Sequence, residues 1–251
     1  MDFLRPKKLK SHSNKLQSSL STPSKTTEFL NSSRPELLEL SVCLSLLHLD
    51  SSLYSILKSH YIKEQSNEAL EYLTIISAYA SGQYSESLFL ARDLLVSSPT
   101  PEVFLIILKI TVNHLGLTDL AHHYSLLALE HNPSAETLKI ARAVVCLSSL
   151  SSTLYQDQKT QLLKEAKALL DSSSSTGKNI LFFKSITNAQ LGLVSEAIVQ
   201  ATEGFKVTLS ANYAALIALI TMAQEDYTGS LSILKRGLQA NPAHLLLYAL
   251  K

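Results

Sequence analysis

The segment SSSSTGKNI, which contains Gly177 and Lys178, has residue types that could do chemistry, because it resembles a phosphate-binding loop. That motif needs a glycine where Ser172 stands and a serine or threonine where Asn179 stands, and it follows a β-strand. We therefore interpret the segment as a flexible loop between two helices. The chain has seven glycines and no glycine-rich dinucleotide-binding motif, so no nucleotide cofactor is expected.

Four histidines, His114, His122, His123 and His131, gather in one stretch of the chain. A metal site would require them to converge with a further ligand, whereas His122 and His123 are adjacent and point about 100° apart on a helix. We expect a polar outer helix face and no metal site. The chain also has no HExxH motif, nucleophile elbow or pair of catalytic carboxylates. The sequence therefore predicts a protein that is not an enzyme and carries no cofactor.

The two cysteines, Cys43 and Cys146, both lie within apolar runs, where a thiol behaves as a small buried hydrophobe. Reduced cysteines of this kind predict a cytoplasmic protein. The N-terminal sequence MDFLRPKKLKSHSNK has no apolar segment after its basic residues, so it is not a secretory signal. The longest charge-free apolar runs, such as Tyr213 to Ala223, are shorter than the roughly 20 residues of a membrane span. No membrane crossing is expected.

The spacing of prolines and glycines predicts the elements that hold these residues. Pro99 and Pro133 are thirty-four residues apart, and Gly82 and Gly116 keep the same interval, which is the period of a tetratricopeptide repeat. Each repeat is a pair of antiparallel helices, in which glycine allows the turn and proline ends the second helix. One pair cannot bury its apolar face alone, but stacked pairs can. The predicted fold is an all-α tetratricopeptide-repeat solenoid, a right-handed superhelix of antiparallel helix pairs.

The low charge content indicates which class of partner such a solenoid binds. Charged residues make up 17% of the chain, compared with about 25% in an average soluble protein, and the mean hydropathy is +0.13. Such a surface is typical of one that another protein partly covers. The net charge of +1 provides no general basic surface, so we expect no nucleic-acid partner.

Residues 1–33 form a predicted flexible basic head that is rich in serine, in which six Lys and Arg residues are opposed by Asp2 and Glu28 alone. This head could contact anionic lipid, each basic residue contributing roughly 1 kcal/mol near the surface, although solvated tails of this composition are common. Residues 34–251 form the predicted solenoid of about six repeats. Their expected starts are Arg34, Glu68, Glu102, Glu136, Lys178 and Ala211.

The fourth repeat is expected to have a lengthened loop between its helices, because the linker LSSLSSTLYQDQ delays the second helix, Lys159 to Leu170. Lys139 and Arg142 then fall on packing positions of the first helix, which predicts a one-residue slip in the register there. Beyond Pro242 the chain begins another helix and stops, so a short C-terminal helix or incomplete repeat is expected.

A partner-binding groove is predicted where fixed positions of each first helix face the inner side of the solenoid. Most of the side chains at these positions are apolar or aromatic: Tyr72, Ile76, Tyr79, Ile106, Ile110, Asn113, Phe182, Ile186, Leu219 and Met222. Such a groove suits an amphipathic helix or another solenoid. The alternative for about half of these residues is packing against the neighbouring first helix. The Lys, Asn and Arg residues that clamp the acidic tails of chaperones are missing from these positions, so chaperone binding is disfavoured.

Three strings of the sequence resemble the tetratricopeptide repeat protein 7 family. They are EYLTIISAYASGQYSESLFLARDLLVSSPTPEVFLIILKI (71–110), ARAVVCLSSLSSTLYQDQKTQLLKEAKALLDSS (141–173) and YAALIALITMAQEDYTGSLSIL (213–234). The second string is similar to the extended repeat of that family, and the third to its late leucine-rich repeat. The resemblance covers roughly residues 34–242 and the C-terminal half of a family member, so the chain is expected to be a shortened, divergent version.

The resemblance implies a non-catalytic scaffold that helps to recruit phosphatidylinositol 4-kinase III alpha to the plasma membrane. The implied partners are a lipid-kinase subunit and a membrane-anchor protein, with peripheral membrane contact through a partner or the basic head. Two alternatives remain open. One is a generic adaptor in trafficking or complex assembly, and the other is a module that binds a lipid or small ligand in the apolar groove.

Overall fold

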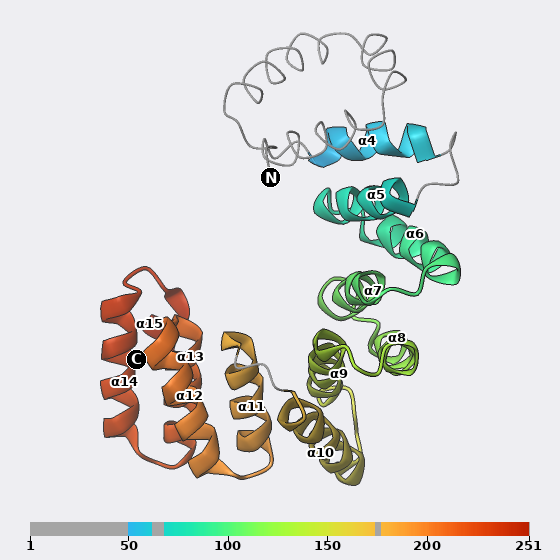
Figure 1. The fold of residues 1–251 in the computed structure, drawn as a ribbon. Coiled ribbons are helices and arrows are strands. Elements are labelled where there is room, and N and C mark those ends of the chain that lie inside the picture. The colour runs from blue at the N-terminus through green and yellow to red at the C-terminus, as the bar shows by residue number, and fades with distance from the viewer. Residues whose placement is uncertain (1–49, 62–67, 174–176, 251) are drawn as a thin grey trace. The chain divides into compact units, whose positions relative to one another are not determined.

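The computed structural model describes residues 50–61, 68–173 and 177–250, and every regular element within these ranges is an α-helix (Figure 1). The predicted all-α fold is therefore confirmed. The helices are α4 (Asp50–Tyr61), α5 (Glu68–Ala80), α6 (Tyr84–Ser97), α7 (Pro101–Asn113), α8 (Thr118–His131), α9 (Glu136–Ser149), α10 (Gln156–Asp171), α11 (Lys178–Gln190), α12 (Val194–Thr208), α13 (Ala211–Ala223), α14 (Tyr227–Ala240) and α15 (Leu245–Leu250).

The chain divides into two compact units between Ser98 and Pro99. In the first unit α5 packs against both α4 and α6. The apolar stripe of α4 is buried at Leu53 and Leu57, and Lys58 Nζ lies 2.5 Å from Glu86 Oε1, which links α4 to α6. The predicted basic head and the predicted first helix of the repeat at residue 34 lie outside the described residues, so the domain boundary at residue 34 stays a prediction.

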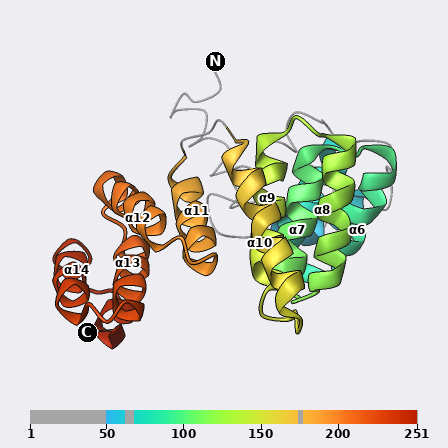
Figure 2. The same ribbon diagram turned by 90° about the horizontal axis from the view of Figure 1, so that it is seen from below.

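The second unit, from α7 to α15, has two layers of helices (Figures 1 and 2). The first helices of successive repeats contact each other in order, α7 with α9, α9 with α11 and α11 with α13. Each second helix packs against the first helices on either side of it, and no comparable packing joins α8 to α10 or α10 to α12 in this part of the chain. Because neighbouring first helices touch while neighbouring second helices are spread apart, the first helices lie on the inner side of this unit.

The turn between the two helices of a repeat needs a left-handed backbone at one residue. Gly82, Gly116 and Gly192 hold that position with φ of +80°, +63° and +79°. Glycine adopts this conformation without the clash that a Cβ brings. In the last full repeat Glu225 occupies the equivalent position and adopts the same conformation, with φ of 62°. The turn geometry is therefore imposed by the fold even where glycine is missing.

Small residues let the helices approach closely. Ser87, Ala121, Ala197 and Ser230 occupy equivalent positions near the start of the second helices and are all buried. Two of them also satisfy their hydroxyl groups on the partner helix, because Ser87 Oγ donates to the Ile75 carbonyl and Ser230 Oγ to the Ala218 carbonyl. The small residues therefore stabilise the helix pair both by packing and by hydrogen bonding.

Two glycines mark the closest approaches in the last repeats. A Cβ on Gly204 of α12 would lie 2.2 Å from two ring atoms of Tyr213, and one on Gly237 of α14 would lie 2.6 Å from the Ala214 Cβ. Both glycines pack against buried residues of α13, and Gly237 also lies against Leu247 of α15. A larger side chain would have to displace the Tyr213 ring at Gly204, and α13 itself at Gly237.

An asparagine at the end of a second helix ties successive repeats together. Asn132 Nδ2 donates to the Pro99 carbonyl at 3.2 Å, and Asn241 Nδ2 donates to the Leu209 carbonyl at 2.7 Å. Pro99 follows α6 and Leu209 follows α12, so in both cases the acceptor lies just after the second helix of the previous repeat. The Asn-Pro pairs at 132–133 and 241–242 therefore fix the join between repeats as well as ending a helix.

The repeat with the lengthened loop keeps the expected register. Helix α9 begins at Glu136, where that repeat was expected to start, and α10 begins at Gln156, three residues before the predicted Lys159. Arg142 is buried at 1% exposure, so it does occupy a packing position, and the slip that the sequence suggested is wrong. The physical reason is a set of polar partners for its guanidinium, described below.

Candidate functional site

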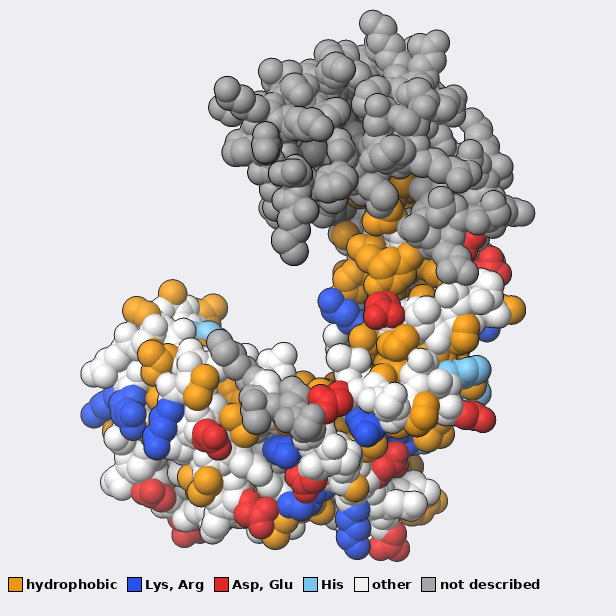
Figure 3. Space-filling view, viewed as in Figure 1, with side chains coloured by type: hydrophobic (Ala, Val, Ile, Leu, Met, Phe, Trp, Pro, Cys, Tyr) orange, Lys and Arg blue, Asp and Glu red, His pale blue; other side chains and the backbone are white. Residues whose placement is uncertain are grey.

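In the first unit, α5 carries the predicted groove residues Tyr72, Ile76 and Tyr79 on one face, because they are spaced by four and then three residues. Ile76 is 38% exposed and the two tyrosines are half-buried. The Tyr79 ring meets the Tyr84 ring of α6 edge to face, with centroids 5.7 Å apart. Figure 3 shows hydrophobic side chains exposed over α5 and α6. This face of α5 therefore combines exposed apolar surface with an aromatic ring, Tyr79, that packs against α6.

In the second unit, six predicted groove residues remain open to solvent at least in part. Leu219 is 48% exposed. They lie in pairs on the same face of α7, α11 and α13, at spacings of seven, four and three residues: Ile106 and Asn113, Phe182 and Ile186, and Leu219 and Met222. These helices form the inner layer, and the six side chains are exposed or half-buried on it, while their role in a partner-binding groove stays a prediction.

Ile110 does not belong to this surface, because its side chain is fully buried. Helix α7 buries residues on several sides, including Val103, Phe104 and Ile107, and only a narrow strip of it remains open. Phe182 has a mixed role, since its ring packs edge to face against the Tyr213 ring with centroids 5.4 Å apart. The alternative for these residues was packing against the neighbouring first helix. Phe182 does this in part, since Tyr213 belongs to α13.

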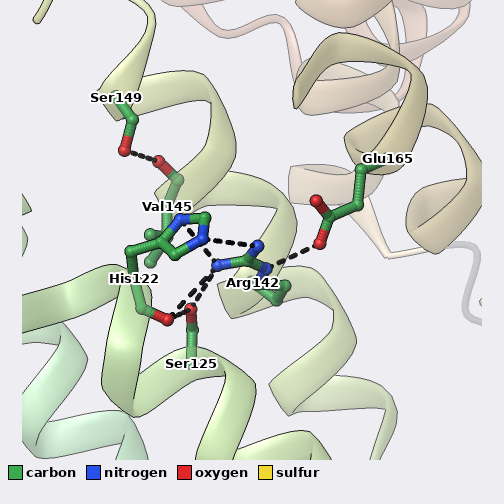
Figure 4. A network of polar contacts seen from close by, with 6 residues as sticks. All are labelled: His122, Ser125, Arg142, Val145, Ser149 and Glu165. Carbon is green, nitrogen blue, oxygen red and sulfur yellow. Dashed lines mark hydrogen bonds and ion pairs between the residues drawn. The ribbon is translucent and has the colours of Figure 1, made fainter. Parts of the chain in front are cut away.

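A second feature, which the sequence did not reveal, is a polar network around Arg142 (Figure 4). Its Nε donates to Glu165 Oε1 of α10 at 2.8 Å, and one terminal nitrogen donates to Ser125 Oγ of α8 at 2.9 Å. The same nitrogen lies 3.0 Å from His122 Nδ1 and 3.3 Å from the His122 carbonyl oxygen. A buried arginine on α9 thus joins three helices.

The electrostatics of this network favour a neutral imidazole. Burial first, and then the Arg142 guanidinium, lower the pKa of His122. A neutral imidazole can accept a hydrogen bond from Arg142, whereas an imidazolium would place a second positive charge beside it. His122 therefore does not sit on a polar outer face as predicted, while His114, His123 and His131 are exposed. The sequence did contain one indication of the network, namely the basic residue Arg142 at a position where a packed apolar or small residue is expected.

Next to this network lies a cavity of about 660 Å³. It is open to solvent and is lined from three places: the start of α8 with Asp119 and His122, the loop from 150 to 155, and the face of α10 that carries Gln161 and Glu165. The corresponding turns of the other described repeats are shorter, for example residues 81–83 and 191–193. The lengthened loop is therefore what builds this cavity.

The described residues do not support the other chemical candidates. Gly177 is the N-cap of α11 and Lys178 is its first residue, so the GK pair follows a helix and not a strand, as predicted. No three His, Cys, Asp or Glu residues of residues 50–61, 68–173 and 177–250 come together as a metal site. Burial raises the pKa of the Cys146 thiol to about 11, which confirms the buried interpretation, and Cys43 lies outside the described residues. No described helix has the length and apolar character to cross a membrane.

Comparison with solved structures identifies the class of fold. The chain resembles a tetratricopeptide-repeat protein of Thermus thermophilus, TTC0263, with a TM-score of 0.61 and 16% identity over 73% of this chain and 96% of that one. It also resembles a chain of the APC/C hetero-tetramer Cut9–Hcn1, with a TM-score of 0.65 and 14% identity, spanning 90% of this chain but 44% of that one.

A third solved structure is YrrB, described as a tetratricopeptide-repeat protein with an unusual peptide-binding site. Its TM-score is 0.55, at 13% identity over 77% of this chain and 96% of that one. No family model matches the sequence, and no curated protein matches it either. The chain thus has the tetratricopeptide-repeat α-solenoid fold, the class that the spacing of its prolines and glycines predicted.

Proposed function

We propose that this protein is a non-catalytic adaptor that binds another protein through the apolar face of its first helices. The observation that carries the proposal is the set of exposed or half-buried apolar side chains on α5, α7, α11 and α13, with Ile76 and Leu219 the most open. The likeness to YrrB, whose description includes a peptide-binding site, supports the same class of function.

The physical reason is the free energy of burying apolar surface, about 25 cal/mol for each Å² removed from water. An amphipathic helix of a partner would cover residues such as Ile106, Ile186 and Met222, which are already half-buried and hence restricted in motion. Ordering them further costs little entropy. Both compact units present such a face, and each can be tested by itself.

The test uses one charge substitution in each unit, Ile76→Glu and Leu219→Glu. Each glutamate remains hydrated in the free protein, but it would be forced against an apolar partner and cost several kcal/mol there. The matched controls are Phe89→Glu and Val199→Glu, which place the same charge on exposed positions of second helices, 68% and 65% exposed.

We expect proteins that co-purify with the wild-type chain from cells to be lost with Ile76→Glu, Leu219→Glu or both, and retained with the two controls. All variants should keep the thermal midpoint of the wild type within a few degrees. Equal loss with control and test variants, or retention with all four, would rule out the first-helix face as the binding surface.

A more specific proposal is that the partner belongs to a phosphatidylinositol 4-kinase III alpha complex, at the cytoplasmic side of the plasma membrane. Its support is the order of the three resembling strings, with the lengthened loop between α9 and α10 in the place where that family has its extended repeat. The same co-purification tests it by mass spectrometry. Recovery of unrelated trafficking or assembly factors without kinase subunits would leave the general adaptor and exclude this assignment.

A further inference from the structure

The cavity beside Arg142 has the chemistry of a binding site that is separate from the first-helix face. It is built by the lengthened loop, and its lining mixes hydrogen-bonding side chains with apolar ones. Its volume of about 660 Å³ falls within the range of ligand pockets. Leu154 at 89% exposure and Tyr155 at 68% exposure belong to its lining, so two large apolar side chains there stand open to water.

The charges that face this cavity are negative. Asp119 is exposed on the α8 wall, and Glu165 is half-buried on the α10 wall. The positive charge of Arg142 lies behind them, since its side chain is 2% exposed and its donors are directed to Glu165, Ser125 and His122. With the pKa of His122 lowered, the imidazole adds no positive charge near neutral pH.

Glu165 is held in position for a ligand. Its Oε1 accepts from Arg142 Nε at 2.8 Å, which fixes the carboxylate, while Oε2 has no hydrogen-bond partner among the described residues. A carboxylate has lone pairs for two or more donors, so a second cation can bind Oε2 without displacing Arg142. Asp119 supplies a further carboxylate, and the Gln158 and Gln161 amides supply oxygen acceptors on the same lining.

We propose that this cavity binds the guanidinium of an arginine side chain from a segment of a partner protein. The planar guanidinium has five N–H donors, which suit a lining that carries the Glu165 and Asp119 carboxylates, and the Tyr155 ring and Leu154 on the same lining can cover the apolar stem of the arginine and its flanking residues. The site does not depend on the first-helix face, so it provides a second contact for a partner or a contact for a second partner.

The experiment measures binding of a fluorescein-labelled peptide of sequence ALRLRA to the full chain by fluorescence polarisation, with ALQLQA as the uncharged probe. We expect ALRLRA to bind and ALQLQA not to bind. Asp119→Asn should weaken binding about tenfold, as expected for one charged hydrogen bond. Asp157→Asn is the matched control, since it removes the same charge from the start of α10 but does not line the cavity, and it should change binding less than twofold.

Further arms separate the outcomes. Leu154→Ala should weaken ALRLRA binding, and Leu219→Glu should leave it unchanged, which keeps this result independent of the first-helix proposal. Absence of ALRLRA binding, equal binding of both peptides, or equal effects of Asp119→Asn and Asp157→Asn would overturn the proposal. Displacement of ALRLRA by an equal concentration of putrescine would also overturn it, because the site would then hold a small free diamine.

Discussion

Glu225 stands where the other described repeats with short turns have a glycine, and it offers a direct measure of the strain in the turn. Its φ of 62° matches the +63° to +80° of the three turn glycines. For a residue with a Cβ this left-handed conformation costs about 1–2 kcal/mol. The exposed Glu225 side chain has no ion pair among the described residues, so Glu225→Gly removes no such interaction.

The expected gain is the strain minus the cost of glycine in the unfolded chain. Glycine adds about 0.4–1 kcal/mol of backbone entropy there, which leaves a net stabilisation of about 0.5–1 kcal/mol for Glu225→Gly. For a chain of this size the thermal midpoint should rise by about 1–4 °C. Charge effects are small, because Glu225 lies between the C-terminus of α13 and the N-terminus of α14, whose dipoles act on it in opposite directions.

The assay is urea unfolding followed by circular dichroism, with two companion variants. Gly192→Ala should destabilise by a similar amount, because the new Cβ meets no atom within 4 Å and only the backbone strain counts. Glu203→Gly, an exposed glutamate in the interior of α12, should also destabilise by about 0.5–1 kcal/mol. If Glu225→Gly were destabilising to the same extent as Glu203→Gly, the left-handed strain would not be present in the protein.

Three further predictions follow from the packing and the buried groups. Gly204→Ala should destabilise by about 1–3 kcal/mol in urea unfolding, because its Cβ would lie 2.2 Å from the Tyr213 ring; a neutral result would show that the ring moves freely. The free energy of unfolding should fall as the pH drops below about 6.5. The reason is that the pKa of His122 is lowered in the folded protein, so the unfolded chain takes up the proton at a higher pH. His122→Gln should make the free energy of unfolding depend less on pH in this range. Cys146 should resist iodoacetamide at pH 8 in the folded protein, as judged by peptide mass mapping, because burial raises its pKa to about 11; rapid labelling would contradict its burial.

The sequence alone determined the elements and their order. Pro99 and Pro133 set the repeat length, and Gly82, Gly116 and Gly192 set the turns, because both residue types act through local backbone geometry. The period of apolar residues then predicted the helices, on which nine of the ten expected groove residues are at least partly open to solvent. These patterns can be recognised in the sequence without knowing which residues each side chain contacts.

The tertiary structure decided what each side chain meets. Ile110 has the same chemistry as Ile106, and only the packing around α7 shows that the first is buried and the second is half open. Arg142 looked misplaced in the sequence because its partners, Ser125 and Glu165, lie seventeen and twenty-three residues away on other helices. A buried charge is stable only when such partners converge on it, and convergence across three helices is a property of the folded chain that local sequence patterns do not encode.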